Sequence, residues 1–249
     1  MGIDAYVHCG CWRDGLATPP AVGPVGFDEY GRLGLLAEWT RDTAEAHGEV
    51  EHWLSTGCAH EDMTVAREHL GSGTRHLARA LREAGLPVLL RRLPVTNDGF
   101  IPAEEVPQVL AELEVFESEA RLPDEIVLVV EAGDTVLGDG RFTGPRYRGG
   151  TDEDGFFVLD AREDPPVTVF RATRFEQRAL PGGELELTGE NGTVRLAGMT
   201  PFASFLPTTP RWLAVEVRTR SGADFAHVLG MLRRLCAASL TTGSPVTWT

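Results

Sequence analysis

The sequence predicts an α+β fold made of two lobes. Apolar residues recur at helical spacing through most of the first half of the chain, which nonetheless opens with a strand. Short alternating stretches and a hairpin signal dominate the second half, followed by one late amphipathic helix. We therefore predict a helical lobe over residues 1–122 and a β-rich lobe over residues 123–249, with one integrated domain as the alternative.

The N-terminal lobe begins with extended segments. Alternation of Ile3, Ala5 and Val7 with other residues predicts a strand. Farther on, Trp53 and its apolar neighbours keep helical spacing, and Gly57 provides a stop. In chain order we predict a strand over 2–8, a Gly- and Pro-rich loop over 13–26, a turn over 27–33 between short extended pieces, and a helix over 43–56.

Two helices and a short strand are predicted for the rest of this lobe. A helix over 62–83 follows from the spacing of its leucines, although its central glycines leave two shorter helices as the alternative. The apolar run at 87–93 predicts a strand. Pro102 suits the first turn of the next helix, and Pro107 either kinks that helix or moves its start. The buried side of this helix would hold Val106, Val109, Leu110, Leu113 and Phe116.

Extended segments predominate from residue 123 onward. Gly133 and Asp134 indicate a turn, and Gly189 to Gly192 lie between two alternating runs, as in a hairpin. The predicted strands cover 125–131, 135–137, 156–159, 167–175, 184–188, 193–197 and 213–217, and a mobile loop rich in Gly, Arg and Asp covers 138–155.

The chain closes with a helix and a short strand. Ser221 and Asp224 have the spacing of a helix N-terminal cap. The apolar face that follows includes Cys236, and Gly243 ends the helix. Residues 246–248 are predicted to return as an edge strand.

Charge and composition argue against several classes of protein. The 249-residue chain has a net charge of −14, which disfavours nucleic acid as a partner because counterion release favours basic proteins. The chain contains no lysine, so it has none for a Schiff base, a phosphate-binding loop or a kinase site. It also lacks a dinucleotide fingerprint and a Gly-x-Ser-x-Gly motif.

We predict a cytoplasmic protein that does not contact membranes. The N-terminus lacks a signal-peptide pattern, and no apolar run approaches the roughly 20 residues that cross a bilayer. Four cysteines are too few for a disulfide scaffold of this size. In a reducing compartment, clustered cysteines more often bind metal or perform chemistry.

Three of the four cysteines lie in two short clusters. Cys9 and Cys11 follow the first predicted strand, and Cys58 and His60 follow the first predicted helix. Residues two apart in an extended chain point to the same side, so each pair can chelate one ion. Thiolate and imidazole are the ligands that zinc prefers, and closed structural sites use four of them. We predict a zinc site formed by Cys9, Cys11, Cys58 and His60.

Several alternatives remain open for these clusters. His8 and Glu61 flank the two pairs and are rival ligands. Three protein ligands would leave a position for water, as catalytic zinc requires, whereas four ligands with three sulfurs favour a structural site. Three unlinked thiols are a further interpretation, because the spacing differs from the usual Cys-x₂-Cys arm.

The remaining histidines and Cys236 are predicted to be structural. Cys236 falls on an apolar helix face and is expected to be a core thiol. The histidines are placed on predicted helices, and His69 and His76 share one helix face at the edge of its buried stripe. The full set is His47, His52, His69, His76 and His227.

Arginines gather in the β-rich lobe, at Arg141, Arg146, Arg148, Arg171, Arg174 and Arg178. Arginine forks bind carboxylates or phosphates in pairs, so an anion pocket is one interpretation. The other interpretation, which we favour, is a solvated face paired with nearby acids, including Asp152, Glu153 and Asp154.

Three stretches of the chain resemble bacterial proteins of unassigned function. They are Met-Gly-Ile-Asp at residues 1–4, Cys-Ala-His-Glu-Asp at residues 58–62, and Thr-Gly-Ser-Pro-Val-Thr-Trp at residues 242–248. The resemblance is scattered along the chain and implies no activity.

These observations favour a binding or interaction protein with a structural zinc site. Its acidic surface would suit a basic protein partner, as in an immunity-type inhibitor. The alternative is a zinc-dependent hydrolase, with three zinc ligands and with the arginine-rich loop holding an anionic small substrate. The sequence identifies no catalytic residue.

Overall fold

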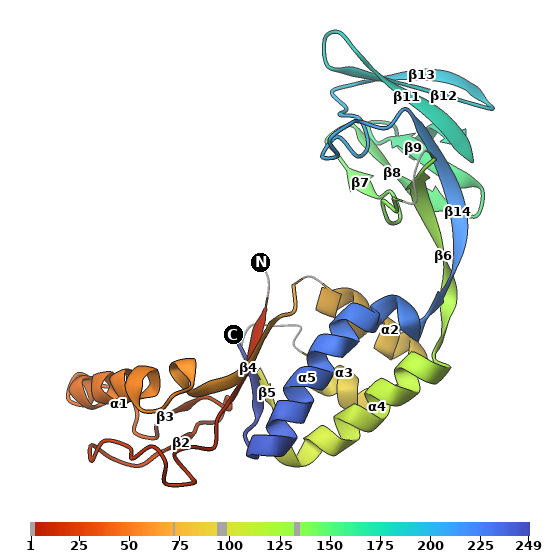
Figure 1. The fold of residues 1–249 in the computed structure, drawn as a ribbon. Coiled ribbons are helices and arrows are strands. Elements are labelled where there is room, and N and C mark those ends of the chain that lie inside the picture. The colour runs from red at the N-terminus through yellow and green to blue at the C-terminus, as the bar shows by residue number, and fades with distance from the viewer. Residues whose placement is uncertain (1–2, 72, 94–98, 132–134) are drawn as a thin grey trace. The chain divides into compact units, whose positions relative to one another are not determined.

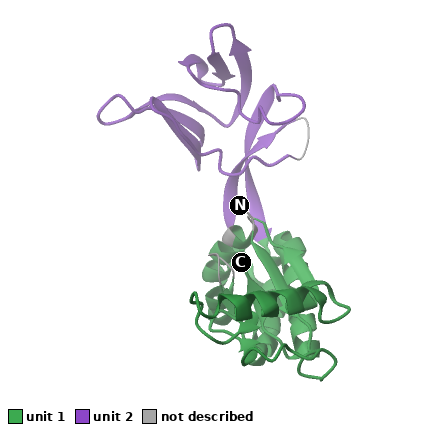
Figure 2. Ribbon diagram, turned by 90° about the vertical axis from the view of Figure 1, so that its left-hand side faces the viewer, with its two compact units in different colours: residues 1–122, 221–249 green, residues 123–220 purple. Residues whose placement is uncertain are grey.

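The computed structural model describes residues 3–71, 73–93, 99–131 and 135–249, and it has the predicted α+β fold. The chain forms two compact units (Figure 2). Unit 1 consists of residues 1–122 and 221–249, and unit 2 consists of residues 123–220. The chain passes from unit 1 to unit 2 between residues 122 and 123, where the sequence analysis placed the lobe boundary. Residues 221–249 were predicted to belong to the second lobe, but the last helix and the last strand pack within unit 1.

Unit 1 is built around a four-stranded sheet with the order β4-β1-β15-β5, in which neighbouring strands are antiparallel. The strands are β1 (Asp4–His8), β4 (Thr64–His69), β5 (Gly99–Ile101) and β15 (Val246–Trp248). Four helices lie on one side of it, namely α2 (Gly73–Ala84), α3 (Pro87–Arg92), α4 (Val106–Glu119) and α5 (Ala226–Thr242) (Figure 1). Toward the other side lie the hairpin of β2 (Val25–Phe27) and β3 (Leu33–Leu35) and the helix α1 (Ala44–Thr56).

The two faces of this sheet have different characters. Ala5 and Val7 of β1 are fully buried in one apolar core with leucines of α2, α4 and α5. Tyr6 and His8, the alternate residues of the same strand, share a cavity with residues of β3 and α1. One strand therefore supplies both the main core and the wall of a polar cavity.

The predicted helix over residues 62–83 is wrong in its first half. Residues 64–69 form β4, which pairs with β1 through a bulge at Val7 and His8 and alternates in exposure. Pairing with β1 provides hydrogen bonds that no local pattern reveals. Gly71, at φ +58°, then allows the turn into α2. His69 therefore lies on a strand, and its Nδ1 is 2.7 Å from a carboxylate oxygen of Asp4.

The predicted strand at residues 87–93 is also wrong, because Pro87 begins α3. A helix start leaves backbone N–H groups without partners inside the helix. The N–H groups of Val88 and Leu89 donate to the carboxylate of Glu112 on α4, at 3.2 and 2.6 Å. A side chain more than twenty residues away thus stabilises this helix.

The remaining helices follow the sequence. Gly57 caps α1, and the chain enters α4 through η2 (Ala103–Glu105), so that Pro107 lies in its first turn. Ser221 and Asp224 form a capping box at η3 (Gly222–Phe225), which leads into α5, and Gly243 ends α5 at φ +66°. In the described part of the chain, no helix is both long and apolar enough to span a bilayer.

The last strand is not at an edge. β15 pairs with β1 on one side and with β5 on the other. Its three residues are all buried, including Trp248. The position of a short strand in a sheet is set by partners from distant parts of the chain, so the sequence pattern alone did not reveal it.

Unit 2 contains two sheets with the orders β10-β9-β8-β7 and β13-β12-β11-β14-β6. Phe156 and Phe175 stack in its core with ring centroids 4.9 Å apart, and Phe202 packs edge-on against both. The predicted run 167–175 is divided between two strands. The bounds are β6 (Arg121–Val130), β7 (Phe142–Thr143), β8 (Tyr147–Asp152), β9 (Gly155–Asp160), β10 (Val167–Ala172), β11 (Arg174–Leu180), β12 (Glu184–Gly189), β13 (Gly192–Ala197) and β14 (Trp212–Ser221).

Residues 138–155, predicted as a mobile loop, instead contain β7 and β8. Glycine here serves close packing. A Cβ on Gly149 would lie 2.4 Å from the carbonyl oxygen of Phe157 and 2.3 Å from the ring of Phe142. The predicted hairpin is confirmed, with Gly189 paired to Gly192. The predicted turn at residues 133–134 lies outside the described residues.

Candidate metal centre

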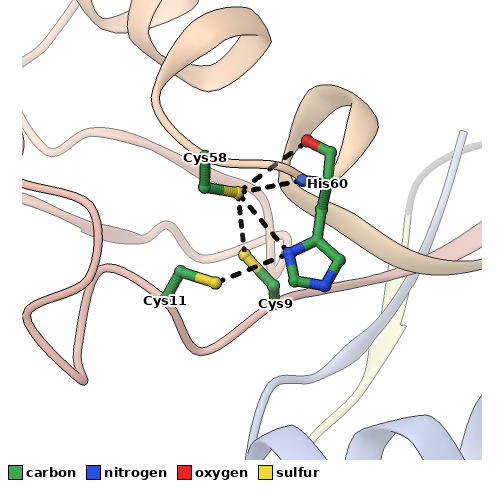
Figure 3. A group of neighbouring side chains, drawn as sticks. All are labelled: Cys9, Cys11, Cys58 and His60. Carbon is green, nitrogen blue, oxygen red and sulfur yellow. Dashed lines mark hydrogen bonds between the residues drawn. The ribbon is translucent and has the colours of Figure 1, made fainter.

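Cys9, Cys11, Cys58 and His60 lie together in unit 1, and their potential ligand atoms are all within 4.8 Å of one another. Sγ of Cys9 is 3.7 Å from Sγ of Cys58. Nδ1 of His60 is 3.5 Å from the sulfurs of both Cys11 and Cys58. The three sulfurs and the imidazole point toward one another (Figure 3). The four residues are therefore close enough to bind one metal ion.

The first pair of ligands is fixed where β1 leaves the sheet. The backbone N–H of Cys9 donates to the carbonyl of Met63 at 2.7 Å. The carbonyl of Cys11 accepts hydrogen bonds from the N–H groups of Leu16 and Ala17, at 2.8 and 3.1 Å. These bonds hold Cys9 against the start of β4 and close a tight loop around Cys11.

The second pair follows the end of α1. The N–H of Gly57 donates to the carbonyl of Trp53 at 2.7 Å and completes the last turn of that helix. A Cβ on Gly57 would lie 2.6 Å from the Trp53 ring, so glycine lets the chain pass close to the indole. The N–H of His60 then points to Sγ of Cys58 at 3.4 Å, an arrangement that places both side chains on one side of the turn.

The four side chains differ in burial. Cys9 is 1% exposed and packs in an apolar cluster with Leu33, Val50 and Met63. Burial raises the pKa of the Cys9 thiol to about 12, because the apolar surroundings disfavour a thiolate. Cys11 and Cys58 are half-buried and His60 is exposed, so the group lies at the edge of this cluster. A metal ion bound there would displace the thiol proton and neutralise the thiolate.

His8 and Glu61 do not join this group within the described part of the chain. Nδ1 of His8 donates to the carbonyl of Met63 at 3.2 Å. Burial lowers the pKa of His8 and favours the neutral imidazole. His8 faces the polar cavity described above.

The other predicted structural residues have separate environments. Cys236 is fully buried in the main core, and burial raises the pKa of its thiol to about 12. His47 lines the same cavity as His8, and His52 lines a second one on the outer side of α1. His76 and His227 are exposed.

The arginines singled out in the β-rich lobe all belong to unit 2. Four of them pair with carboxylates, whereas Arg148 and Arg178 are exposed on β8 and β11. The hydrolase alternative combines a zinc site with an arginine-rich loop. The candidate metal ligands belong to unit 1 and these arginines belong to unit 2. The pairs are Arg141 with Asp139, Arg146 with Asp160, Arg171 with Asp152, and Arg174 with Glu131.

Arg13 is a structural residue that no local sequence pattern indicates. Its guanidinium donates to the carbonyls of Thr242 and Gly243 and to Oγ of Ser244, the last two at 2.9 and 2.8 Å. These carbonyls lie at the C-terminal end of α5, where a cation is favourable. The loop that follows Cys11 thereby caps the last helix.

No protein-family model matches the chain, and no curated protein or solved structure proved similar to it.

Proposed function

We propose that this chain is a binding protein whose N-terminal segment is held by a structural zinc ion on Cys9, Cys11, Cys58 and His60. The distances between ligand atoms carry the proposal. A tetrahedral site with Zn–S bonds of about 2.3 Å and a Zn–N bond of about 2.0 Å has edges of about 3.8 Å between sulfurs and about 3.5 Å between sulfur and nitrogen. Sγ of Cys9 and Sγ of Cys58 are 3.7 Å apart, and Nδ1 of His60 is 3.5 Å from the sulfurs of Cys11 and Cys58, so these three distances match such edges. The remaining distances within the group are no longer than 4.8 Å. A disulfide would require about 2.0 Å.

A structural role is favoured over a catalytic one. Three sulfurs and one nitrogen fill a tetrahedron, which leaves no position for the water that a hydrolase activates. The two ligand pairs come from the ends of β1 and α1, so one ion would join the sheet to this helix. Arg146 and Arg171, which were candidates for holding a substrate, are paired with Asp160 and Asp152.

The charge of the chain supports a basic protein as its partner. The net charge is −14, and complementary potentials accelerate association and exclude like-charged competitors. An immunity-type inhibitor of a basic toxin is one protein of this kind. Such a complex would form more slowly as the salt concentration rises.

Mass spectrometry of the native, untagged protein tests the zinc proposal. We expect one zinc per chain, lost in Cys58→Ser and retained in Cys236→Ser, which removes a thiol far from the ligand group in sequence. A metal-free protein whose exposed thiols all react freely with a thiol reagent would refute the proposal, as would equal zinc contents in the two variants.

A further inference from the structure

Unit 1 contains a cavity of about 600 Å³ on the polar face of its sheet. This volume is in the range of small-molecule sites. Tyr6 and His8 of β1 and Arg67 of β4 form one wall. Arg32, from the turn that joins β2 to β3, and Glu51 of α1 lie on the others. Leu33, Leu35, Val50 and Leu54 give the same cavity an apolar part.

The proposed zinc ion would hold this cavity in shape. His8 immediately precedes the ligand Cys9, and α1, which contributes His47 and Glu51, ends immediately before Cys58. The ion would therefore fasten two walls of the cavity to each other at one end. A structural metal at this position would therefore keep the cavity in the shape that binds a ligand.

The charges in the lining have both signs. Arg32 and Arg67 supply guanidinium groups, and Asp28, Glu51 and Asp62 supply carboxylates. Nη2 of Arg67 is 3.4 Å from Oδ2 of Asp62, but both side chains are about half exposed. Ion pairs this exposed contribute little to stability. A simple anion would meet the carboxylates, and a simple cation would meet the guanidiniums. A ligand that carries one charge of each sign satisfies both sets.

A further observation concerns the backbone beside the cavity. Asp62 and Met63, where the chain enters β4, both have left-handed backbone conformations, with φ of 49° and 50°. Such conformations are unfavourable for residues other than glycine and concentrate at ligand sites.

We propose that this cavity binds a small zwitterion of the amino-acid class. The ligand carboxylate lies against Arg32 and Arg67. The ligand ammonium lies against Glu51 and Asp62, and the apolar part of the cavity takes the ligand side chain. The proposal extends the proposed function, because the zinc ion then holds a small-molecule site.

Calorimetry on the zinc-loaded full chain tests the proposal. The standard L-amino acids are titrated one by one, and we expect saturable binding of at least one. For that amino acid, the analogue without the amino group and the analogue without the carboxylate should each bind more weakly by about tenfold or more. D-glucose serves as a neutral polar probe and should not bind.

Matched variants locate the binding in this cavity. Arg32→Gln and Glu51→Gln should each weaken binding by about tenfold or more while zinc content and melting temperature stay unchanged. Arg41→Gln and Glu49→Gln, which alter exposed residues outside this cavity, should bind like the parent protein. The use of two cavity variants on different elements guards against a folding defect in one of them.

Three results would overturn the proposal. They are no saturable binding of any amino acid up to about 10 mM, equally tight binding of an analogue that lacks one charge, and unchanged binding in both cavity variants. Zinc present without amino-acid binding refutes this inference alone. A protein without zinc refutes the metal proposal, whatever the calorimetry shows.

Discussion

Unit 2 and the segment of unit 1 that contains the candidate metal ligands, residues 9–63, are organised in different ways. Unit 2 has a full apolar core, in which Phe156 and Phe175 are completely buried and stacked. In the segment of residues 9–63, α1 buries only Val50 and Trp53, and β2 and β3 have three residues each. The first region resembles an ordinary β core, whereas the second is a thin layer over the polar face of a sheet.

The difference bears on the proposed zinc ion. A chain of about 60 residues buries too little apolar surface to be more than marginally stable alone, and small structures commonly add a metal or a disulfide. The segment of residues 9–63 is of this size and contains the four candidate ligands. Unit 2 has no need of such a link, because its strands bury large aromatic side chains on their own.

The largest effect is expected from Cys58→Ser. Structural zinc contributes about 10–16 kcal/mol of apparent binding free energy in zinc-finger peptides, and this variant would lose it. Hydrogen exchange should show the amides of α1 exchanging freely while β11 and β12 keep their protection. A chelator should reproduce this pattern.

The matched control for that variant is Cys236→Ser. It should lower the free energy of unfolding by about 1–3 kcal/mol without loss of protection in α1, because it places a polar hydroxyl in the main core and leaves the four candidate ligands unchanged. If both variants behaved alike, Cys58 would be merely another buried thiol and the comparison between the two regions would fail.

The next effect concerns the core of unit 2. Phe175→Ala should lower the free energy of unfolding of that unit by about 3–5 kcal/mol, because it leaves a cavity beside Phe156 and Phe170. Denaturant unfolding followed by hydrogen exchange would measure this loss. Zinc content and the protection of α1 should not change, and a simultaneous loss of zinc would contradict the independence of the two regions.

A smaller effect is expected from Arg13→Ala. This variant removes the cap that the loop after Cys11 provides to α5, and we expect a loss of about 1–2 kcal/mol in the free energy of unfolding. The same substitution should have less effect in Cys58→Ser, because the loop would already be released. A double-mutant cycle from thermal or denaturant unfolding measures this coupling, and purely additive effects would contradict it.

The smallest effect is a pH dependence confined to unit 2. Arg162, with help from Arg146, lowers the pKa of Asp160 below its ordinary value. Because the folded-state pKa is the lower one, the stabilisation is present above the unfolded-state pKa of about 3.9 and is lost as the pH falls below it. The melting temperatures of Asp160→Asn and the parent protein should therefore differ most between about pH 5 and about pH 7, where the carboxylate is charged. Measurements in this range and at about pH 3, below the unfolded-state pKa, would show whether the difference shrinks as the carboxylate is protonated.

Local patterns predicted the elements whose stabilising contacts lie nearby in the sequence. The capping box of Ser221 and Asp224 and the hairpin around Gly189 to Gly192 need only neighbouring residues, and both are present. The strand β4 and the helix α3 were predicted wrongly. β4 depends on hydrogen bonds to β1, and α3 depends on the carboxylate of Glu112.

The sequence by itself indicated the candidate ligand set of Cys9, Cys11, Cys58 and His60, because the two residues of each pair are two positions apart and such spacing lets their side chains point to one side. It also determined α4 and α5 through their apolar spacing. Only the tertiary structure decided that the two ligand pairs meet, that Arg13 caps α5, and that Arg32, Glu51 and Arg67 share one cavity. The physical reason is distance along the chain. These contacts join residues brought together by sheet pairing and helix packing, and no local pattern encodes the partner on a distant element.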